Sequence, residues 1–462
     1  MRLHPGRLVK RLLVFLVLFV AAYGLGRVVV VWWDSQFVGE RAPYLQSMAS
    51  DGVTLRWHSR EAYRGVVRYG SAPDALVRSQ AELEAVTDHH VRLEGLVPGT
   101  RYYYSVGAAD EVFRGGRDYW FVTAPPWPAE QAADPVRLWV TGDPGQPGED
   151  QLAVAGAARD WARAHRRASP LPFDAWLTTG DNAYRSGSMA QFQAALFEPF
   201  ANVLRNVPFW PAYGNHDARR RAFFRLFDFP RRGEAGGLPS GSEHYFAFDH
   251  GPVHVVMLDS QDGDLAPDSE MLDWLVRDLR ANRRPWVIAV FHHPPYTRGS
   301  HDSDSRRDSG GRMVRVRERL VPLLERLGVD LVLSGHSHMY ERSHLLACHY
   351  GDSASWRPGL ALQRPADFVY RKRRDGAMPP GGGLDGTIYV VVGSSSRLDD
   401  GPLDHPAMAV SRHALGSLVI DVTAGALTAR FVERDGRIGD RFRILKGQAQ
   451  APAPLSACPP AP

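Results

Sequence analysis

The sequence predicts two folded domains in tandem: an all-β domain, followed by an α/β domain in which helices flank two packed sheets. Three observations support this prediction. Residues 41–124 alternate between short apolar runs and turn signals, and from residue 136 strand-like runs alternate with helix-like runs. Between these regions, residues 124–135 are rich in Pro and Ala, which is typical of a linker. A chain of 462 residues is long enough for both domains.

The first 33 residues are predicted to be a targeting segment. A basic start precedes an apolar run over residues 12–26, and the run resumes over residues 28–33 after Arg27. The first run has about the length of the apolar core of a signal sequence. This pattern predicts export to the periplasm, to the medium or to the outer face of a membrane. Cleavage of the leader and membrane anchoring through residues 12–33 are the two alternatives.

The net charge and the cysteine content limit which partners and which compartment the sequence suits. The formal net charge is +4, but five basic residues lie in the leader, so the rest of the chain is close to neutral. This balance argues against nucleic acid as a stable partner. Cys348 and Cys458 can form a disulfide in an oxidising compartment, although the sequence does not decide their pairing. Cys458 lies in a Pro/Ala tail over residues 448–462, which is predicted to be disordered.

In the all-β part, residues 53–57 and 101–106 show the alternation of apolar and polar side chains that half-buried strands require. Turn signals at residues 50–52 and 98–100 separate these strands from their neighbours. Several such short strands in one domain favour a β-sandwich.

The second part alternates strands with helices, as expected for packed sheets with helices outside. Strands are predicted over residues 136–141, 175–179, 286–291, 330–334, 387–392, 418–422 and 429–432, with a hairpin over residues 245–259. Helices are predicted over residues 150–167, 189–207, 270–281 and 313–327. Residues 343–386 contain many Arg, Gly and Pro and are predicted to form a surface insertion or lid.

Five short polar blocks, in order along the chain, each follow a run predicted to be a buried strand. Ligands at the ends of neighbouring strands can converge on one point. A two-metal hydrolytic centre needs such convergence, with hard oxygen donors, imidazole nitrogens and at least one bridging carboxylate. The blocks are Gly-Asp-Pro-Gly at 142–145, Gly-Asp-Asn-Ala-Tyr at 180–184, Gly-Asn-His-Asp at 214–217, His-His-Pro at 292–294 and Gly-His-Ser-His at 335–338.

Taken together, the five blocks resemble the calcineurin-like metallophosphoesterase superfamily. The Tyr that ends the second block and the sequence Gly-His-Ser-His-Met-Tyr-Glu-Arg at 335–342 are most similar to the purple acid phosphatase branch. The resemblance covers roughly residues 40–445 and implies a four-layer α/β/β/α metallophosphoesterase sandwich preceded by an all-β fibronectin-III-like domain. Together with the leader and the tail predicted from composition, the parts are a signal peptide or membrane anchor (1–33), the fibronectin-III-like domain (38–124), the catalytic domain (136–447) and the disordered tail (448–462).

The resemblance also implies seven metal ligands in two sets that share Asp181, because a carboxylate has two oxygens and can bind two cations. The first set has Asp143, Tyr184 and His338, and the second set has Asn215, His292 and His336. His292 and His293 are adjacent, so both cannot point inward from one strand end. The family's His-x-Pro pattern selects His292 as the ligand.

Tyr184 determines the predicted cofactors. A phenol has an ordinary pKa of about 10, so binding as a phenolate requires a strongly acidic cation such as Fe(III). The resemblance therefore implies two metal ions, Fe(III) in the first set and a divalent Zn, Mn or Fe in the second. The alternative role for Tyr184 is packing against the strand.

Two further histidines are predicted to be catalytic. The family places His216 on the substrate phosphate, and a structural hydrogen bond is the alternative role. His301 lies nine residues after His292 in a Gly-Ser-Asp-rich stretch and is a candidate general acid for the leaving alkoxide. The alternative for His301 is a solvent-exposed loop histidine. Asp217 stands where plant members usually carry Glu, which leaves the role of this acid open.

The predicted function is hydrolysis of phosphate monoesters, of the acid phosphatase type, by attack of a metal-bound hydroxide on phosphorus. The partner is therefore a phosphate ester substrate. A phosphodiesterase or nucleotidase with the same metals is the first alternative, because specificity depends on variable loops, here predicted at residues 261–269, 297–312 and 343–386. A surface adhesion protein with an inactive catalytic half is the second alternative. The sequence makes no prediction of the oligomeric state.

Overall fold

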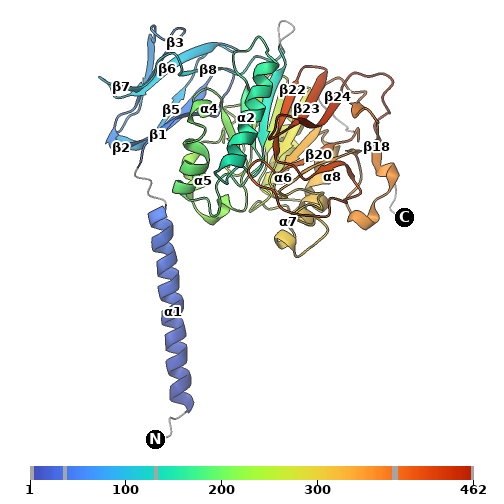
Figure 1. Cartoon of the computed structure of the whole chain (residues 1–462), viewed down its shortest axis with the longest axis horizontal. Coiled ribbons are helices and arrows are strands. Elements are labelled where there is room, and N and C mark those ends of the chain that lie inside the picture. Colours follow the sequence, from blue (N-terminus) through green and yellow to red (C-terminus); the bar gives the residue numbers. More distant parts are fainter. Residues whose placement is uncertain (1–4, 35–38, 129–133, 377–382, 459–462) are drawn as a thin grey trace.

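The computed structural model describes residues 5–34, 39–128, 134–376 and 383–458. Parts of the predicted leader, linker, insertion and tail therefore lie outside the described residues. Two folded domains pack side by side, and a long helix, α1 (Pro5–Asp34), extends away from them (Figure 1). Within the described ranges, no helix combines the length and the apolar character needed to cross a membrane.

The N-terminal domain is a sandwich of two antiparallel sheets. One sheet has the order β1-β2-β5, and the other has the order β4-β3-β6-β7, with β8 paired to β6. The strands are β1 (Arg41–Gln46), β2 (Val53–Tyr63), β3 (Val66–Gly70), β4 (Arg78–Ala81), β5 (Val86–Leu93), β6 (Arg101–Gly107), β7 (Val112–Arg114) and β8 (Trp120–Val122). Leu55, Tyr104 and Phe121 are fully buried in its core. This is the predicted fibronectin-III-like arrangement.

A continuous hydrophobic core joins the N-terminal domain to the second domain. The hydroxyl of Tyr44 donates to the carbonyl of Leu226 at 2.5 Å, and the hydroxyl of Tyr104 donates to the carbonyl of Arg205 at 2.8 Å. The rings of Tyr44 and Phe197 lie 4.8 Å apart. Because each buried phenol is satisfied by a carbonyl of the other domain, the two domains form one packed unit.

Two seven-stranded sheets form the second domain. The first has the order β11-β10-β9-β22-β23-β24-β19, and the second has the order β12-β13-β14-β15-β20-β16-β21. The first sheet contains β9 (Val136–Thr141), β10 (Ala175–Thr178), β11 (Phe209–Pro211), β19 (Val369–Arg371), β22 (Gly416–Val422), β23 (Ala426–Glu433) and β24 (Ile438–Leu445). The second contains β12 (Phe246–His250), β13 (Val253–Met257), β14 (Trp286–Val290), β15 (Leu331–Ser334), β16 (Tyr340–Ser343), β20 (Ile388–Val392) and β21 (Met408–Arg412).

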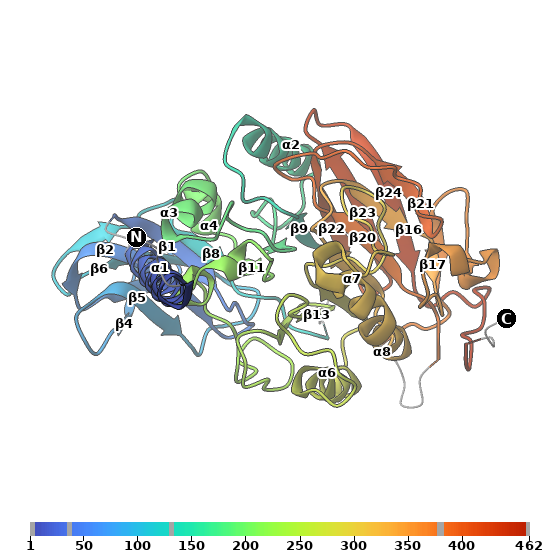
Figure 2. The same ribbon diagram turned by 90° about the horizontal axis from the view of Figure 1, so that it is seen from below.

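Helices cover the outer faces of both sheets, with α2 on one side and α6 and α8 on the other (Figure 2). These helices are α2 (Glu149–Ala164), α6 (Glu270–Ala281) and α8 (Val321–Arg326). In β14, Ile288 and Val290 belong to the core between the sheets, whereas Val287 and Ala289 belong to the core under the helices. This alternation follows from the opposite directions of successive strand side chains. The predicted four-layer sandwich is confirmed.

Two helices that the sequence predicts as continuous are interrupted. Residues 189–207 form α3 (Met189–Phe192), a π-helical turn (Gln193–Phe197) and α4 (Ala201–Leu204), and residues 313–327 form α7 (Arg312–Arg315), a π-helical turn (Val316–Leu320) and α8. Pro199 and Pro322 lie at these interruptions and have no N–H group to donate. The remaining short helices are α5 (Ala222–Leu226) and single 3₁₀ turns at Asp217–Arg219, Asp308–Gly311, Ser353–Ser355 and Pro358–Leu360.

The predicted insertion packs onto the second domain through β17 (Leu345–Leu346), which pairs with β18 (Ala361–Gln363), and through β19, which pairs with β24. A disulfide joins Cys348 to Cys458. Leu384 and Leu455 exchange two backbone hydrogen bonds of 2.8 and 2.9 Å. The tail up to residue 458 therefore lies against the insertion, which differs from the disorder predicted from its composition.

A buried carboxylate beneath the insertion makes stability depend on pH. Glu325 is 2% exposed and accepts hydrogen bonds from the Cys348 N–H, the Tyr350 hydroxyl and the Tyr389 hydroxyl. Burial raises the pKa of the Glu325 carboxyl from 4.5 to about 7. Because the pKa is higher in the folded state, this stabilisation is complete below about pH 4 and is lost as the pH rises through about 7.

We therefore expect Glu325 to lower the free energy of unfolding by about 3 kcal/mol between pH 4.5 and pH 8. Denaturant unfolding of the wild type and of Glu325→Gln at both pH values measures this change in the free energy of unfolding. The variant should lack the contribution of Glu325 to the change. Glu318→Gln, on the exposed side of the same helical segment, should keep the dependence of the wild type. Equal pH dependence in wild type and Glu325→Gln would contradict the prediction.

Candidate metal centre

The predicted polar blocks meet at one edge of the two sheets, where parallel strands end. β9 runs parallel to β10, and β13, β14 and β15 run parallel to one another. Asp143 lies just beyond β9 and Asp181 just beyond β10, while His292 and His336 follow β14 and β15. Since the carboxyl ends of parallel strands share one edge, the strand order brings together residues that are distant in sequence.

Three of the candidate ligands have a left-handed backbone. The φ angles are 51° at Asp143, 52° at Asp181 and 67° at His336, a region that few residues other than Gly adopt. This conformation costs about 1–2 kcal/mol per residue. It persists where the surrounding fold holds it, often at functional sites. The backbone is therefore independent support for a functional site at this edge.

The first group of side chains surrounds the hydroxyl of Tyr184. This hydroxyl lies 3.0 Å from Nε2 of His338, 3.1 Å from Oδ2 of Asp181 and 3.3 Å from Oδ1 of Asp143. Nε2 of His338 is also 3.5 Å from Oδ1 of Asp143. All four side chains are buried, so their polar atoms face one another rather than solvent. The structure thus brings together the four residues predicted as the first set.

The second group surrounds Nε2 of His292. This atom lies 2.9 Å from Oδ1 of Asn215, 3.1 Å from Nδ1 of His336 and 3.5 Å from Oδ1 of Asp181. Nδ1 of His292 donates to the carbonyl of Thr179 at 2.8 Å, so Nε2 carries the lone pair. A lone pair that faces a carboxylate, an amide oxygen and a second imidazole favours a cation among them.

Asp181 lies between the two groups. Its Oδ2 accepts a hydrogen bond from Tyr184 at 3.1 Å, while its Oδ1 faces His292 and accepts from the N–H of His216 at 2.8 Å. One oxygen of the carboxylate therefore faces each group. A carboxylate that bridges two cations requires this geometry.

The electrostatics of the cluster also fit cations. Burial, followed by Asp181 and Asp143, raises the pKa of the Tyr184 phenol well above its ordinary value. Burial, followed by the neighbouring His293 and His292, lowers the pKa of His336 well below its ordinary value. The cluster thus holds buried carboxyl groups beside His336, an imidazole whose charged form is disfavoured. Hard oxygen donors together with imidazole nitrogens suit Fe, Zn and Mn, so the donor set fits two metal ions.

His216 lies at the edge of the first group. Its ring is 4.5 Å from the ring of Tyr184, and its Nε2 is 3.9 Å from Oδ2 of Asp181. Its Nδ1 donates to the carbonyl of Arg185 at 2.8 Å. Burial lowers the pKa of the His216 imidazole. With a fifth of its side chain exposed (21%), His216 stands between the cluster and solvent, where a substrate would arrive.

His301 lies against the second group. Its ring stacks on His336 with centroids 3.9 Å apart and planes inclined by 17°. Its Nδ1 donates to Oδ1 of Asp308 at 2.8 Å, and 31% of its side chain is exposed. The loop that carries it therefore folds back onto a candidate ligand instead of standing free in solvent. The catalytic role of His301 stays a prediction.

His293 points elsewhere than its neighbour. Its Nδ1 lies 3.0 Å from the hydroxyl of Ser260, and its backbone N–H donates to the same hydroxyl at 2.9 Å. Its ring is 4.6 Å from that of His336, so the three histidines form one buried group able to hold a metal ion. His292 is the one that faces Asn215 and Asp181. This geometry favours His292 as the ligand.

Asp217 ties two blocks together below the cluster. It is fully buried and accepts hydrogen bonds from the N–H and the side-chain amide of Asn182 and from the N–H of Gly214. Burial, followed by the charge of Asp181, raises the pKa of Asp217 well above its ordinary value. Asp217 therefore holds in place the backbone next to Asp181 and Asn215.

Sequence reasoning missed the partners behind the histidines. Nε2 of His336 lies 2.5 Å from the hydroxyl of Ser309, and Nδ1 of His338 donates to Oδ2 of Asp399 at 2.6 Å. Asp399 is 61 residues from His338 and belongs to none of the five blocks. No signal in the sequence connects these residues, because only the strand order of the second sheet places them together.

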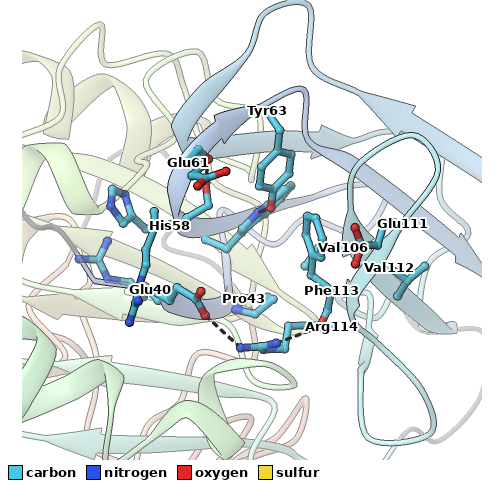
Figure 3. Close-up of a pocket in the computed structure, with 14 residues that line it drawn as sticks. Glu40, Pro43, His58, Glu61, Tyr63, Val106, Glu111, Val112, Phe113 and Arg114 are labelled. Atoms are coloured by element: carbon cyan, nitrogen blue, oxygen red, sulfur yellow. Dashed lines mark hydrogen bonds and ion pairs between the residues drawn. The ribbon is translucent and has the colours of Figure 1, made fainter.

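A separate pocket of about 550 Å³ lies in the N-terminal domain (Figure 3). Tyr63 and Phe113 form an aromatic wall, with ring centroids 5.0 Å apart, and Glu40 pairs with Arg114 at 3.3 Å across its rim. None of the predicted site residues lines this pocket. This pocket and the candidate centre therefore lie in different domains.

Comparison with protein families agrees with this architecture. The sequence model described as calcineurin-like phosphoesterase matches residues 136–340, and the one described as purple acid phosphatase, N-terminal domain, matches residues 42–123. The chain therefore carries a calcineurin-like phosphoesterase domain, preceded by a domain similar to the N-terminal domain of purple acid phosphatases.

Individual relatives are distant. The chain is 27% identical to probable purple acid phosphatase 20 of Arabidopsis thaliana, over 54% of this chain and 53% of that protein. It is 26% identical to acid phosphatase type 7 of Homo sapiens, over 63% of this chain and 67% of that protein. The solved structure of a purple acid phosphatase from yellow lupin (Lupinus luteus) seeds matches with a TM-score of 0.68 at 18% identity, over 91% of this chain and 77% of that chain. This likeness supports the fold. The chain spans about half the length of the Arabidopsis relative.

Proposed function

We propose that this chain is a binuclear metal-dependent phosphatase of the acid phosphatase type, which hydrolyses phosphate monoesters. One observation carries the proposal: seven donor side chains lie in two groups, and one oxygen of Asp181 faces each group. Asp143, Tyr184 and His338 would hold the first cation, Asn215, His292 and His336 would hold the second, and Asp181 would be shared.

Two bound cations supply a water of lowered pKa and neutralise charge on the phosphoryl oxygens. Nδ1 of His216 donates to the carbonyl of Arg185, so His216, at the edge of the first group, would donate a hydrogen bond to a phosphoryl oxygen from Nε2 in its protonated, imidazolium form. Asp308 accepts a hydrogen bond from Nδ1 of His301, so in the imidazolium form Nε2 of His301 would carry the proton that passes to the leaving oxygen. His336, under the ring of His301, keeps that imidazole beside the second group.

Tyr184 supports a mixed pair of metals. Because burial and the nearby carboxylates raise the pKa of its phenol, only a strongly acidic cation can bind it as phenolate. We therefore assign Fe(III) to the group that contains Tyr184. The second group has two imidazoles and an amide besides the shared carboxylate, which suits divalent Zn, Mn or Fe.

The first test is the visible spectrum of the purified, oxidised protein, with metal analysis of the same sample. We expect a broad band in the green-to-yellow region, about one iron and about one divalent metal per chain. p-Nitrophenyl phosphate should be hydrolysed faster than bis(p-nitrophenyl) phosphate. A protein with the expected metals and no hydrolysis of either substrate would contradict the enzymatic proposal.

A phosphodiesterase or nucleotidase remains the alternative outcome of this test. A colourless protein that binds two zinc or manganese ions and prefers the diester would support it and would leave Tyr184 a packing residue. The rim segments are connected, since Arg312 donates to the carbonyl of Gln261 at 2.7 Å and Ser353 donates its N–H to Asp304 at 3.1 Å. These contacts join the three segments on which a preference for a monoester or a diester would depend.

We also propose that residues 1–33 direct export and that the domains span residues 38–124 and 136–447. The leader composition supports export, and so does the disulfide between Cys348 and Cys458, because disulfides persist in oxidising compartments. Fractionation of cells that make the chain with and without residues 1–33 tests this part, and retention of the full chain in the cytoplasm would contradict it.

A further inference from the structure

Each of the three candidate histidine ligands directs one ring nitrogen to the cluster and the other to a partner outside it. The partner is the carbonyl of Thr179 for His292, at 2.8 Å, and the hydroxyl of Ser309 for His336, at 2.5 Å. For His338 it is the carboxylate of Asp399, at 2.6 Å. Only His338, in the group of Tyr184, has a charged partner among these three.

Asp399 is itself held in place. Nη2 of Arg397 donates to Oδ1 of Asp399 at 2.7 Å and to Oδ2 at 2.8 Å. Both residues belong to the segment that follows β20, a central strand of the second sheet. With 36% of its side chain exposed, Asp399 has room to move, so the contacts with Arg397 and His338 account for its orientation.

A carboxylate that accepts the N–H of a ligating imidazole has two effects. It selects one tautomer, so the lone pair of His338 lies on Nε2, the atom 3.0 Å from the Tyr184 hydroxyl. It also makes that nitrogen a stronger electron donor. A neutral carbonyl or hydroxyl group has a weaker effect of this kind. Among the three histidines, His338 is thus the one whose donor nitrogen is strengthened by a carboxylate.

We propose that Asp399 is a positioning residue that holds His338 and strengthens the binding of the cation in the Tyr184 group. This inference rests on the proposed function, because it requires that the two groups bind metal ions. Asp399 touches no substrate and acts through His338. Arg397 keeps the carboxylate aligned with the ring.

The experiment compares metal retention in the full chain. Wild type, Asp399→Asn and Asp399→Glu are loaded with iron and zinc and then dialysed against a chelator, and each metal is measured with time. Asn keeps the size of the side chain but loses the charge, so the cation of the Tyr184 group should be lost about 10- to 100-fold faster. The visible band should shift or fade with it, while the divalent cation stays. Glu should restore most of the retention.

Asp400→Asn is the matched control, because Asp400 is adjacent to Asp399 and its side chain is fully exposed. Its Oδ1 lies 3.6 Å from Nε2 of His413 at the surface. It should retain both metals as the wild type does. If Asp399→Asn retains iron and its band like the wild type, Asp399 has no such role, although the proposed function stands. If the wild type itself binds no metal, the proposed function fails first, and this inference fails with it.

Discussion

Replacing Asp181 with Asn should remove both cations and lower kcat/KM for a phosphate monoester at least about 10³-fold, which corresponds to about 4 kcal/mol of transition-state stabilisation. Asp181 is the only candidate ligand, among the described residues, whose two oxygens face both groups. An amide offers one neutral oxygen and an N–H donor in place of two anionic oxygens. Metal analysis and steady-state kinetics on the same preparation measure both losses.

Thermal stability distinguishes a bridging role of Asp181 in metal binding from a purely structural role. The Asn side chain can still accept the hydrogen bond from the N–H of His216, and the change removes one of the carboxylates clustered around Tyr184. The metal-free variant should therefore melt at or above the Tm of the metal-free wild type. Asp278→Asn, which alters an equally buried carboxylate paired with His254, should lose stability but keep both metals. Full activity in Asp181→Asn would eliminate Asp181 as the bridge.

Replacing Tyr184 with Phe should give a folded but colourless protein. Phe keeps the ring that packs 4.5 Å from His216 and removes only the hydroxyl, which lies within 3.3 Å of three candidate ligands. Without the phenolate, iron should be lost about tenfold faster to a chelator, and the visible band should disappear at any iron content. Absorption spectra of samples with matched iron content test this directly.

Tyr213→Phe is the control for this change, since both phenols are 8% exposed and Tyr213 belongs to neither group. Its spectrum should equal that of the wild type. A band that survives in Tyr184→Phe would assign the colour to another ligand and would leave Tyr184 with its packing role.

Much of the fold could be predicted because its central strands are buried on both faces. Residues 286–291 are a continuous apolar run, residues 136–141 are apolar except for Arg137 and Thr141, and β9 and β14 begin at the predicted residues. The helix over residues 270–281 has both predicted ends, because its buried residues recur with helical spacing. By contrast, β24 (Ile438–Leu445) was missed, since half-buried positions bring Asp and Arg into the strand.

The candidate residues could also be predicted, although not their contacts. The five blocks supply each donor in sequence order, and the structure brings all seven into two adjoining groups. The separation of His292 from His293 required geometry, because adjacent residues at a strand end differ only in direction. The position of His301 also required the structure, since its stacking on His336 depends on how its loop folds back.

By itself, the sequence determined which donors exist and that each block follows a strand, because a buried strand is mainly apolar and a polar block follows its end. Only the tertiary structure decided how the donors of each predicted set face one another, which nitrogen of each imidazole faces the group, and that Asp399 stands behind His338. These relations join residues that are distant in sequence, such as Asp143 and His336, which lie 193 positions apart. They depend on strand order and register, which local sequence patterns do not encode.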